Sequence, residues 1–489
     1  MKRVLTLLRR GATADPCPPR RGGRRPRRRQ PRRGVAIVLV LSALTILAVM
    51  LAEFQDETSA ELGSALSQRD ALKAEYAAKS SVNLSRLLIA SEPTIRKALA
   101  PLFLLMKQGP PQIPVWEFAD RVLGAFNDSE GNESFLSLAG VSISEGKNLG
   151  LDGAGFEIRI VDEDAKVNIN TPARGDAFSQ ARLAAQLIGL LSGPQYDPMF
   201  SSRDADGQFS DRQAICGAII DWTDPDQEAY VCDPHSGSAQ QAGAEDSYYQ
   251  LLKKPYPRKN AAFDSIEELR LVRGVGEDFW ATFVDPDPSR PEKRVMTVWG
   301  QGKVNVNTAN PQTVLAVICG AAVPGTPLCS DPAEALKFLT AFDLVKSFTA
   351  GAPLFGTPKA FISALKGKGM FGAALSALEM KPIQLLSDTE TLKGITTESL
   401  VFSIYSTGYV KAGKRETRVR IHAVVDFRGA PPPGAAPGTM SAVEAAAAAA
   451  GAGAAAAGAS PLPEGATEAA IAAAFQPNPG GNIIYYRVD

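Results

Sequence analysis

The hydrophobic pattern of the chain begins with an uninterrupted apolar run at residues 35–52. These residues carry no charge, and Ser42 and Thr45 are the plainly polar positions. A helix rises about 1.5 Å per residue, so this run with its flanks crosses a hydrocarbon core of about 30 Å. Leucines then recur at helical intervals among charged residues up to Ser91, before Pro93. The pattern predicts one long helix over residues 35–91, apolar first and amphipathic afterwards.

Strand-like alternation marks three later regions. Residues 156–161 alternate apolar and polar side chains. Residues 402–410 and 415–427 predict a β-hairpin, with Ala412 and Gly413 in its turn. Residues 482–487 predict a final strand. Since this strand follows a low-complexity Ala, Gly and Pro stretch at 429–475, we expect a flexible surface insertion inside a discontinuous domain.

Helical signals dominate between these strands, from about residue 175 to 396. Ser265 with Glu268 forms a capping box that predicts a helix over 266–272. A six-residue segment also recurs: residues 166–171 read Lys-Val-Asn-Ile-Asn-Thr and residues 303–308 read Lys-Val-Asn-Val-Asn-Thr. Each copy precedes a proline and a helical stretch, so we expect two strand-to-helix junctions whose threonine hydroxyls cap the helices. Chance recurrence is a weak explanation for this match.

The distribution of charge predicts how the apolar run is oriented in the membrane. Residues 1–34 hold thirteen basic residues and one acid, although the whole chain balances 52 against 52. Basic residues before a membrane segment remain in the cytoplasm, so the rest of the chain is expected outside it. The basic–Gly–apolar order resembles the class III leader of type IV pilins and type II secretion pseudopilins. This resemblance implies cleavage between Gly34 and Val35 by a prepilin peptidase, with the helix retained. A plain amino-terminal anchor is the alternative.

The five cysteines fall into one leader position, Cys17, and two local pairs. Local pairing predicts disulfides Cys216–Cys232 and Cys319–Cys329 in an oxidising periplasm. Four reduced, buried thiols in a cytosolic protein are the alternative.

Carboxylates concentrate around a turn that follows residue 220. The cluster contains Asp221, Asp224 and Asp226, with Glu245 and Asp246 downstream. Carboxylates this close repel one another unless protons or a hard cation intervene, and calcium takes six to eight oxygen ligands. The spacing is not that of an EF-hand, and a solvated acidic turn is the alternative reading.

Other chemistry is poorly supported by the sequence. Residues 271–276 resemble the hairpin of a helix-hairpin-helix DNA module, but acids surround its Arg270 and Arg273, so a structural hairpin is favoured. With the leader removed the chain is acidic, which does not suit a phosphate backbone. No nucleophile elbow, Walker loop or H-E-x-x-H motif is present, so we expect no enzyme.

Several motifs together resemble the K-type minor pseudopilins of the type II secretion system. They span residues 33 to 427 and, less firmly, the final strand. The motifs are the leader junction and the segments at 162–171, 219–226, 243–249, 255–256, 263–272 and 303–308.

The resemblance implies an α+β, pilin-like fold: a long amino-terminal helix packed on a small antiparallel sheet, with a large inserted helical domain. We expect a cleaved leader at residues 1–34 and a transmembrane and amphipathic helix at 35–91. A first pilin-like part at 92–171 precedes the inserted domain at 172–396. A hairpin part at 397–428, a flexible insertion at 429–475 and a final strand at 476–489 complete the chain.

The family's role implies a subunit that caps the tip of a periplasmic pseudopilus with the I- and J-type minor pseudopilins and supports export across the outer membrane. We therefore expect a methylated, single-pass inner-membrane protein with its later domains in the periplasm, and no nucleic-acid partner. Family members bind calcium in the helical domain, which makes the acidic cluster a candidate site. Pilin-type subunits usually carry glutamate at the fifth mature position. Here that position is Leu39, which fits a subunit with none above it.

Two other functions share some of these features. A minor pilin of a type IV pilus has the same leader and different assembly partners. A membrane-anchored DNA-binding or uptake protein would use the hairpin near Gly274.

Overall fold

The computed structural model describes residues 33–105, 109–127, 149–151, 153–203, 207, 209–232, 247–349, 352–413, 415–431 and 478–489. It divides into two compact units, residues 1–66 and 67–489. The expected leader and most of the Ala/Gly/Pro stretch lie outside the described residues.

The first unit consists, where it is described, of the beginning of helix α1 (Arg33–Leu105). Its apolar window has a mean hydropathy of 2.9 and none of it is buried. Within the described ranges, this is the one helix long and apolar enough to cross a membrane. The predicted membrane helix is therefore present as an exposed apolar segment.

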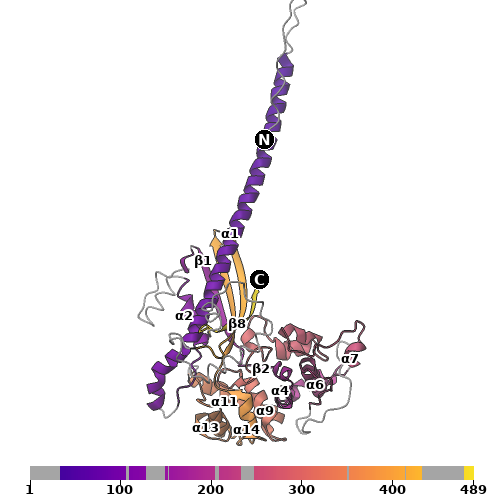
Figure 1. The fold of residues 1–489 in the computed structure, drawn as a ribbon, viewed down its shortest axis with the longest axis vertical. Helices are drawn as coiled ribbons and strands as arrows, with labels where there is room; N and C mark the ends of the chain where they lie inside the picture. Colours follow the sequence, from indigo (N-terminus) through magenta and orange to yellow (C-terminus); the bar gives the residue numbers. More distant parts are fainter. Residues whose placement is uncertain are drawn as a thin grey trace, which may run out of the picture. The chain divides into compact units, whose positions relative to one another are not determined.

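The second unit combines the rest of α1 with a sheet and many short helices (Figure 1). Its strands are β1 (Ala154–Asp162), β2 (Val167–Asn168), β3 (Met296–Thr297), β4 (Val304–Asn305), β5 (Ile395–Thr396), β6 (Val401–Ala412), β7 (Arg415–Asp426) and β8 (Asn482–Val488). Its further α-helices are α2 (Ala119–Gly124), α4 (Ala177–Leu191), α5 (Asp197–Ser201), α6 (Arg212–Thr223), α7 (Ser247–Gln250), α8 (Glu277–Phe279), α9 (Pro311–Ala321), α10 (Pro327–Ser330), α11 (Pro332–Phe348), α12 (Pro358–Leu365), α13 (Gly369–Ala377) and α14 (Asp388–Gly394). Short 3₁₀ segments are η1 (Val115–Phe118), η3 (Thr171–Arg174), η4 (Pro194–Tyr196), η5 (Ile266–Leu271) and η7 (Pro291–Lys293), and η6 (Trp280–Val284) is a π-helix.

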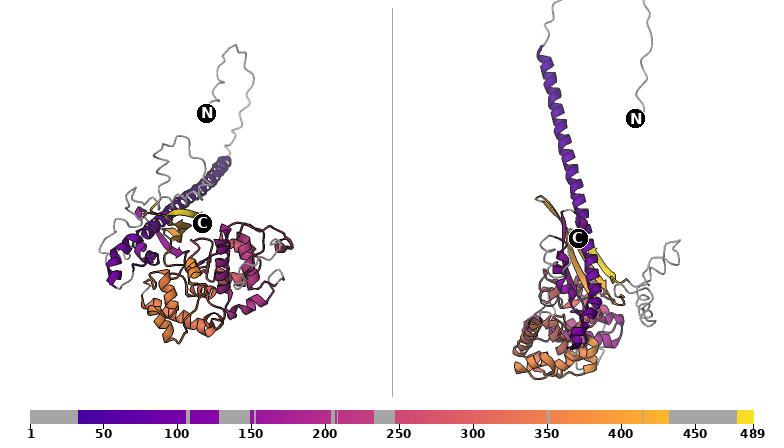
Figure 2. Two further views of the ribbon diagram at one scale, coloured as in Figure 1. Left: turned by 60° about the horizontal axis from the view of Figure 1, so that its bottom comes forward. Right: turned by 90° about the vertical axis from the view of Figure 1, so that its left-hand side faces the viewer.

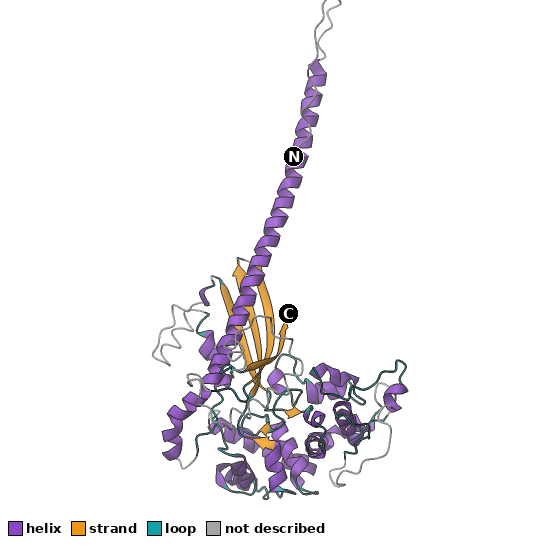
Figure 3. Ribbon diagram, viewed as in Figure 1, coloured by secondary structure: helices purple, strands orange, loops and turns teal. Residues whose placement is uncertain are grey.

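The main sheet is antiparallel with strand order β1-β6-β7-β8 (Figure 3). The part of α1 in this unit crosses one face of the sheet, with buried contacts from Ala74 to Ala90, as the two views in Figure 2 also show. Alternate strand residues, including Phe156, Ile404 and Ala423, form a buried core with Ala78 and Val82 of α1. The predicted hairpin and final strand are confirmed. Strands β1 and β8, which are distant from the hairpin in the sequence, complete the sheet on either side of it.

Small residues bring α1 unusually close to this sheet. A Cβ added at Gly408 of β6 would lie 1.9 Å from the carbonyl oxygen of Ala74. The hydroxyls of Ser81 and Ser406 are 2.5 Å apart in the same buried contact. The helix backbone therefore packs directly on the strand backbone.

Helix α1 continues past the predicted end at Ser91, through Pro93 and Pro101. A proline inside a helix costs about 3 kcal/mol because it removes a hydrogen bond and crowds the preceding turn. Near Pro93 the buried Glu92 accepts hydrogen bonds from Arg96 and from the amide of Ile113. The Glu92–Arg96 pair lies within the helix and the bond from Ile113 is a tertiary contact; both stabilise the turn, and no single-residue propensity reports the second.

The inserted helical domain leaves the sheet after β1 and returns at β6, and its helices gather at that end of the sheet (Figures 1 and 2). Asp162 accepts hydrogen bonds from Thr308 and Ser399. Asp164 accepts them from the amides of Leu400 and Val401. The acidic residues of the 162–164 segment thus join the outgoing chain to the returning chain.

These two carboxyls are deeply buried. Burial raises the pKa of Asp162 to about 7, with repulsion from Asp164 as the next cause, and burial raises the pKa of Asp164 to about 6. Ionisation of this junction therefore opposes folding.

The repeated six-residue segments occupy equivalent positions in the inserted domain. β2 pairs in parallel with β3, and β4 pairs in parallel with β5. Asn170 exchanges two hydrogen bonds with the backbone of Phe263, and Asn307 exchanges the same two with Phe355. The echo in the sequence therefore corresponds to a repeated structural unit.

The helices that follow the two segments, α4 and α9, cross at glycines. A Cβ on Gly189 would lie 2.0 Å from the carbonyl oxygen of Ala316, and one on Gly320 would lie 2.1 Å from that of Ala185. The contact is reciprocal, so each helix needs a glycine where the other backbone passes.

Two local expectations were wrong. The threonines of the repeats do not cap the helices: Asp176 caps α4 and Asn310 caps α9. These caps lie a few residues later because a short segment separates each strand from its helix. Ser265 makes no capping hydrogen bond, and residues 266–271 form a 3₁₀-helix. There the carboxylate of Glu268 accepts from the amide of Asp264 instead.

Candidate functional site

The free face of α1 is the first candidate site. Residues 70, 74, 77, 78, 81, 82 and 85 are buried against the sheet. Leu72, Tyr76 and Leu87 are 54%, 54% and 59% exposed. Their spacings of 4 and 11 residues place them on one side of a 3.6-residue helix. The helix therefore carries an apolar stripe that the other described residues of this chain do not cover.

The predicted processing site lies at the start of the same helix. Gly34 and Val35 are in its first turn, and Leu39 is 63% exposed within the apolar segment. Cleavage at this position and the role of Leu39 remain predictions.

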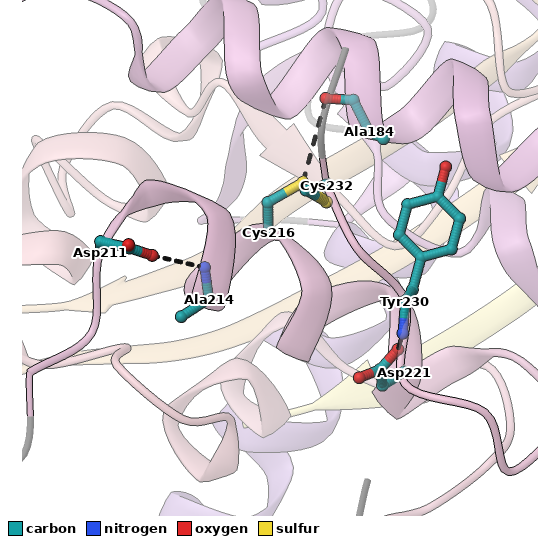
Figure 4. Close-up of a disulfide and its surroundings, with 7 residues drawn as sticks. All are labelled: Ala184, Asp211, Ala214, Cys216, Asp221, Tyr230 and Cys232. Atoms are coloured by element: carbon teal, nitrogen blue, oxygen red, sulfur yellow. Dashed lines mark hydrogen bonds between the residues drawn. A yellow bond between two sulfur atoms is a disulfide. The ribbon is translucent and has the colours of Figure 1, made fainter. Parts of the chain in front are cut away.

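The acidic cluster is the second candidate site, at the end of α6. Asp221 is in the last turn of the helix, Asp224 follows it directly, and Pro225 turns the chain toward Asp226. The disulfide Cys216–Cys232, drawn with Asp221 in Figure 4, closes a stretch of chain that contains all three aspartates. Both predicted disulfides are present, since Cys319–Cys329 also forms. The other two candidate ligands, Glu245 and Asp246, lie outside the described residues.

Each aspartate has a different set of partners. Asp221 accepts a hydrogen bond of 2.8 Å from the amide of Tyr230, as Figure 4 shows. Asp226 accepts one of 2.9 Å from the amide of Glu228. Gln180 of α4 donates to Asp224 Oδ2 at 3.0 Å. Asp224 Oδ1 is buried and has no hydrogen-bond partner among the described residues.

Burial and mutual repulsion disfavour the ionised form of the cluster. Burial raises the pKa of Asp221 to about 7, and burial followed by repulsion from Asp226 raises the pKa of Asp224 to about 7. Asn260 Oδ1 is a second buried oxygen that lacks a partner within the described part of the chain. Unpaired carboxylate and amide oxygens are the donors that calcium prefers, so these residues fit such an ion.

The described carboxylates are not a complete metal site. In the described ranges, no group of three or more His, Cys, Asp or Glu side chains is arranged to hold a metal. Sequence reasoning also missed Gln180, Arg258 and Asn260, which approach the cluster from other segments. Arg258 is buried, with its guanidinium 4.0 Å from Asp224 Oδ1. Their distance along the chain left no local signal that would have found them.

The hairpin near Gly274 is packed into the inserted domain. Gly274 has φ +77°, and a Cβ there would lie 2.5 Å from a side-chain carbon of Ile215. Arg270 stacks over Trp280 at 4.0 Å and pairs with Glu277. These contacts explain why residue 274 is a glycine, and they give Arg270 a structural role.

A long amino-terminal helix on an antiparallel sheet, with an exposed apolar start and a large helical insertion, defines a pilin-like subunit. The sequence model of the family described as "Type II secretion system (T2SS), protein K" matches residues 165–283. The resemblance to the K-type family is thereby confirmed over these residues.

Two individual proteins are also similar. The type II secretion system protein K of Aeromonas hydrophila is 32% identical over 104 residues, which cover 21% of this chain and 27% of that protein. The chain thus matches about a quarter of that relative's length. A solved structure of the GspK-GspI-GspJ complex from the type 2 secretion system of enterotoxigenic Escherichia coli matches with 15% identity and a TM-score of 0.35. The match covers 57% of this chain and 76% of that one.

Proposed function

We propose that this protein is a non-enzymatic minor pseudopilin that caps the tip of the type II secretion pseudopilus and supports protein export across the outer membrane. The observation that carries the proposal is the two-sided helix α1. One side packs on the chain's own sheet, and the other presents Leu72, Tyr76 and Leu87 to solvent. Exposed apolar stripes of this kind mark protein contacts. Helices of the I- and J-type minor pseudopilins are the proposed partners.

The apolar segment serves as a single-pass inner-membrane anchor, and the prepilin peptidase cuts between Gly34 and Val35. The domains after residue 66 then lie in the periplasm, which agrees with two disulfides. Leu39 at the fifth mature position suits a tip subunit because a glutamate there would lack a neighbour's amino terminus to neutralise it in the membrane.

Two experiments test this role in cells with an active prepilin peptidase. Mass spectrometry of the membrane-extracted protein should find a methylated amino terminus at Val35, and an intact leader would contradict processing. In the second, Leu72→Arg combined with Leu87→Arg should abolish co-purification with the I- and J-type subunits and secretion. Leu336→Arg is the control, because Leu336 is also exposed, at 65%, but lies in the inserted domain. Equal loss in both variants would contradict the helix contact.

The alternatives give different results. A type IV minor pilin would co-purify with type IV pilus subunits and leave type II secretion intact when deleted. A DNA-binding protein would retard DNA in a gel shift. We expect no retardation by the detergent-solubilised processed chain that begins at Val35, because the chain is acidic after residue 34.

The same protein is proposed to bind calcium at the acidic cluster. Asp221, Asp224 and Asp226 would hold the ion, with Glu245 and Asp246 as further candidates, and the ion would neutralise carboxylates that repel one another. The buried Asp224 Oδ1, which accepts no hydrogen bond from the described residues, supports this assignment. Chelation should lower the melting temperature of the full chain, and an unchanged melt would remove the calcium claim.

A further inference from the structure

The two edges of the main sheet differ in how their backbone groups are bonded. Strand β1 forms one edge, where the side chain of Asn127 bonds both the amide and the carbonyl of Phe156, and helix α2 packs beside the strand. Strand β8 forms the other edge, and no further strand of the described residues pairs with its outer side. A sheet edge in this state is a template for another strand.

The backbone groups of β8 alternate between β7 and the free edge. Asp489 exchanges two backbone hydrogen bonds with Arg420, each of 2.9 Å. In an antiparallel ladder such bonded pairs recur at every second residue. The amides and carbonyls of Tyr486 and Val488, which lie at the intervening positions, therefore point away from β7. The register shift falls between residues 424 and 425 of β7, outside this stretch.

The side chains at this edge are apolar and exposed. Tyr486 is 42% exposed and Val488 is 44% exposed. The strand contains neither lysine nor proline, which commonly protect sheet edges from pairing. Its position is fixed from the opposite face, because the ring of Tyr485 packs 5.5 Å from that of Trp299 and 5.2 Å from that of His422. The edge is therefore both ordered and accessible to an extended segment.

This edge continues the uncovered stripe on α1. The charges of Lys79 and Glu75 act on the hydroxyl of Tyr486, whose pKa is raised chiefly by burial. The ammonium of Lys79 also lies 5.5 Å from the centre of the ring of Tyr76, which belongs to the stripe. A partner that covers the stripe therefore reaches β8 as well.

We propose that the pseudopilin that packs on α1 also adds an extended strand to β8. Its backbone would bond to the outward amides and carbonyls of Tyr486 and Val488, and its apolar side chains, at alternate positions, would contact these two residues. The inference rests on the proposed function, since it takes an I- or J-type subunit as the partner.

Hydrogen exchange at single-amide resolution tests this pairing. The detergent-solubilised full chain is compared alone and in complex with co-expressed I- and J-type subunits. The amides of Tyr486 and Val488 should exchange at least about tenfold more slowly in the complex, because they acquire hydrogen bonds there. The amide of Arg487, which faces β7, is the internal reference and should exchange slowly in both samples.

Val488→Pro isolates the contribution of one outward amide. Proline removes that amide without removing a bond to β7, and edge strands tolerate it at such positions. Val488→Thr is the matched control, because it keeps both the amide and the β-branched shape. Val488→Pro should melt close to Val488→Thr and bind the two subunits about tenfold more weakly.

The outcomes separate this inference from the proposed function. If the wild-type chain forms no complex with I- and J-type subunits, both fail. If the complex forms and the two amides exchange as fast as in the chain alone, only strand addition fails. Slow exchange in the chain alone would show that a second copy or another segment of this chain covers the edge, which also overturns the inference.

The variants give an independent decision. Equal binding by folded Val488→Pro and Val488→Thr would refute strand addition even if the amides are protected. Should Val488→Pro not fold, the exchange of the wild-type amides decides.

Discussion

The contact between α1 and the sheet makes a sharp prediction at Gly408. In Gly408→Ala the added carbon would lie 1.9 Å from the carbonyl oxygen of Ala74 and 2.7 Å from the amide nitrogen of Ala78. Both atoms belong to a helix backbone, so no side-chain rotation relieves the overlap. Ordinary contact requires about 3.4 Å, so the helix must withdraw by about 1.5 Å.

Withdrawal would also weaken polar contacts across this interface. The buried hydroxyls of Ser81 and Ser406 would separate from their 2.5 Å contact, and the 2.7 Å ion pair between Arg415 and the buried Asp70 would lengthen. Overpacking costs about 1–3 kcal/mol, and loss of a buried hydrogen bond costs about 1 kcal/mol more. We therefore expect Gly408→Ala to destabilise the pilin-like part by about 3 kcal/mol.

Thermal unfolding of the full chain in detergent, followed by circular dichroism, measures this effect. The melting temperature of the pilin-like part should fall by roughly 10 °C. Gly124→Ala in helix α2 is the control, because a Cβ there meets nothing within 4 Å. It should be neutral or stabilising by up to about 1 kcal/mol. If Gly408→Ala melts like wild type, the direct backbone contact inferred here is wrong.

Three further predictions concern the inserted domain and its attachment. Gly189→Ala should destabilise the inserted domain by about 3 kcal/mol, because its Cβ would overlap the carbonyl of Ala316; unchanged protease resistance would contradict this. Since the pKa of Asp162 is raised to about 7, its ionisation opposes folding, and stability should fall as the pH rises from about 4 to 7. Asp162→Asn should flatten that part of the dependence in melts from pH 5 to 8, and an equally steep profile would refute the assignment. Replacing Cys319 and Cys329 together by serine should cost about 2–3 kcal/mol in denaturant unfolding, because the bond closes a loop across a separation of 10 residues; an unchanged midpoint would show that this bond stabilises nothing.

Periodic elements were the most predictable part of this fold. The hairpin appears as β6 and β7, and Gly413 in its turn has φ +65°, which glycine adopts readily. The final strand was predicted because residues 482–487 are continuously strand-like after a low-complexity stretch. Both signals come from residues that are close together in the sequence, so they can be recognised without the tertiary structure.

Features that depend on distant contacts were not predictable. The helix continues through Pro93, and beside it Glu92 is bonded to Ile113, a contact that no local pattern reports. The threonines of the repeats were expected to cap helices, but Thr308 instead donates to Asp162, 146 residues earlier in the chain. Such bonds form only when the inserted domain folds back onto its own attachment.

The acidic cluster was predictable in composition but not in arrangement. The density of carboxylates at 221–226 indicated a site, and the structure brings three of them into one disulfide-closed loop. The cation within that loop comes from Arg258, more than thirty residues later. The density of carboxylates in the sequence therefore indicated the region. Only the tertiary structure showed that Arg258 lies beside them.

The attachment of the inserted domain also bears on how long that domain can be. Asp162 and Phe402 are opposite one another in neighbouring antiparallel strands, and the amide of Glu163 bonds the carbonyl of Val401. Two strands that meet in this way need only a tight loop between them. The inserted domain thus occupies a position where a β-turn would suffice, so the pairing of β1 with β6 sets no limit on the length of chain between them.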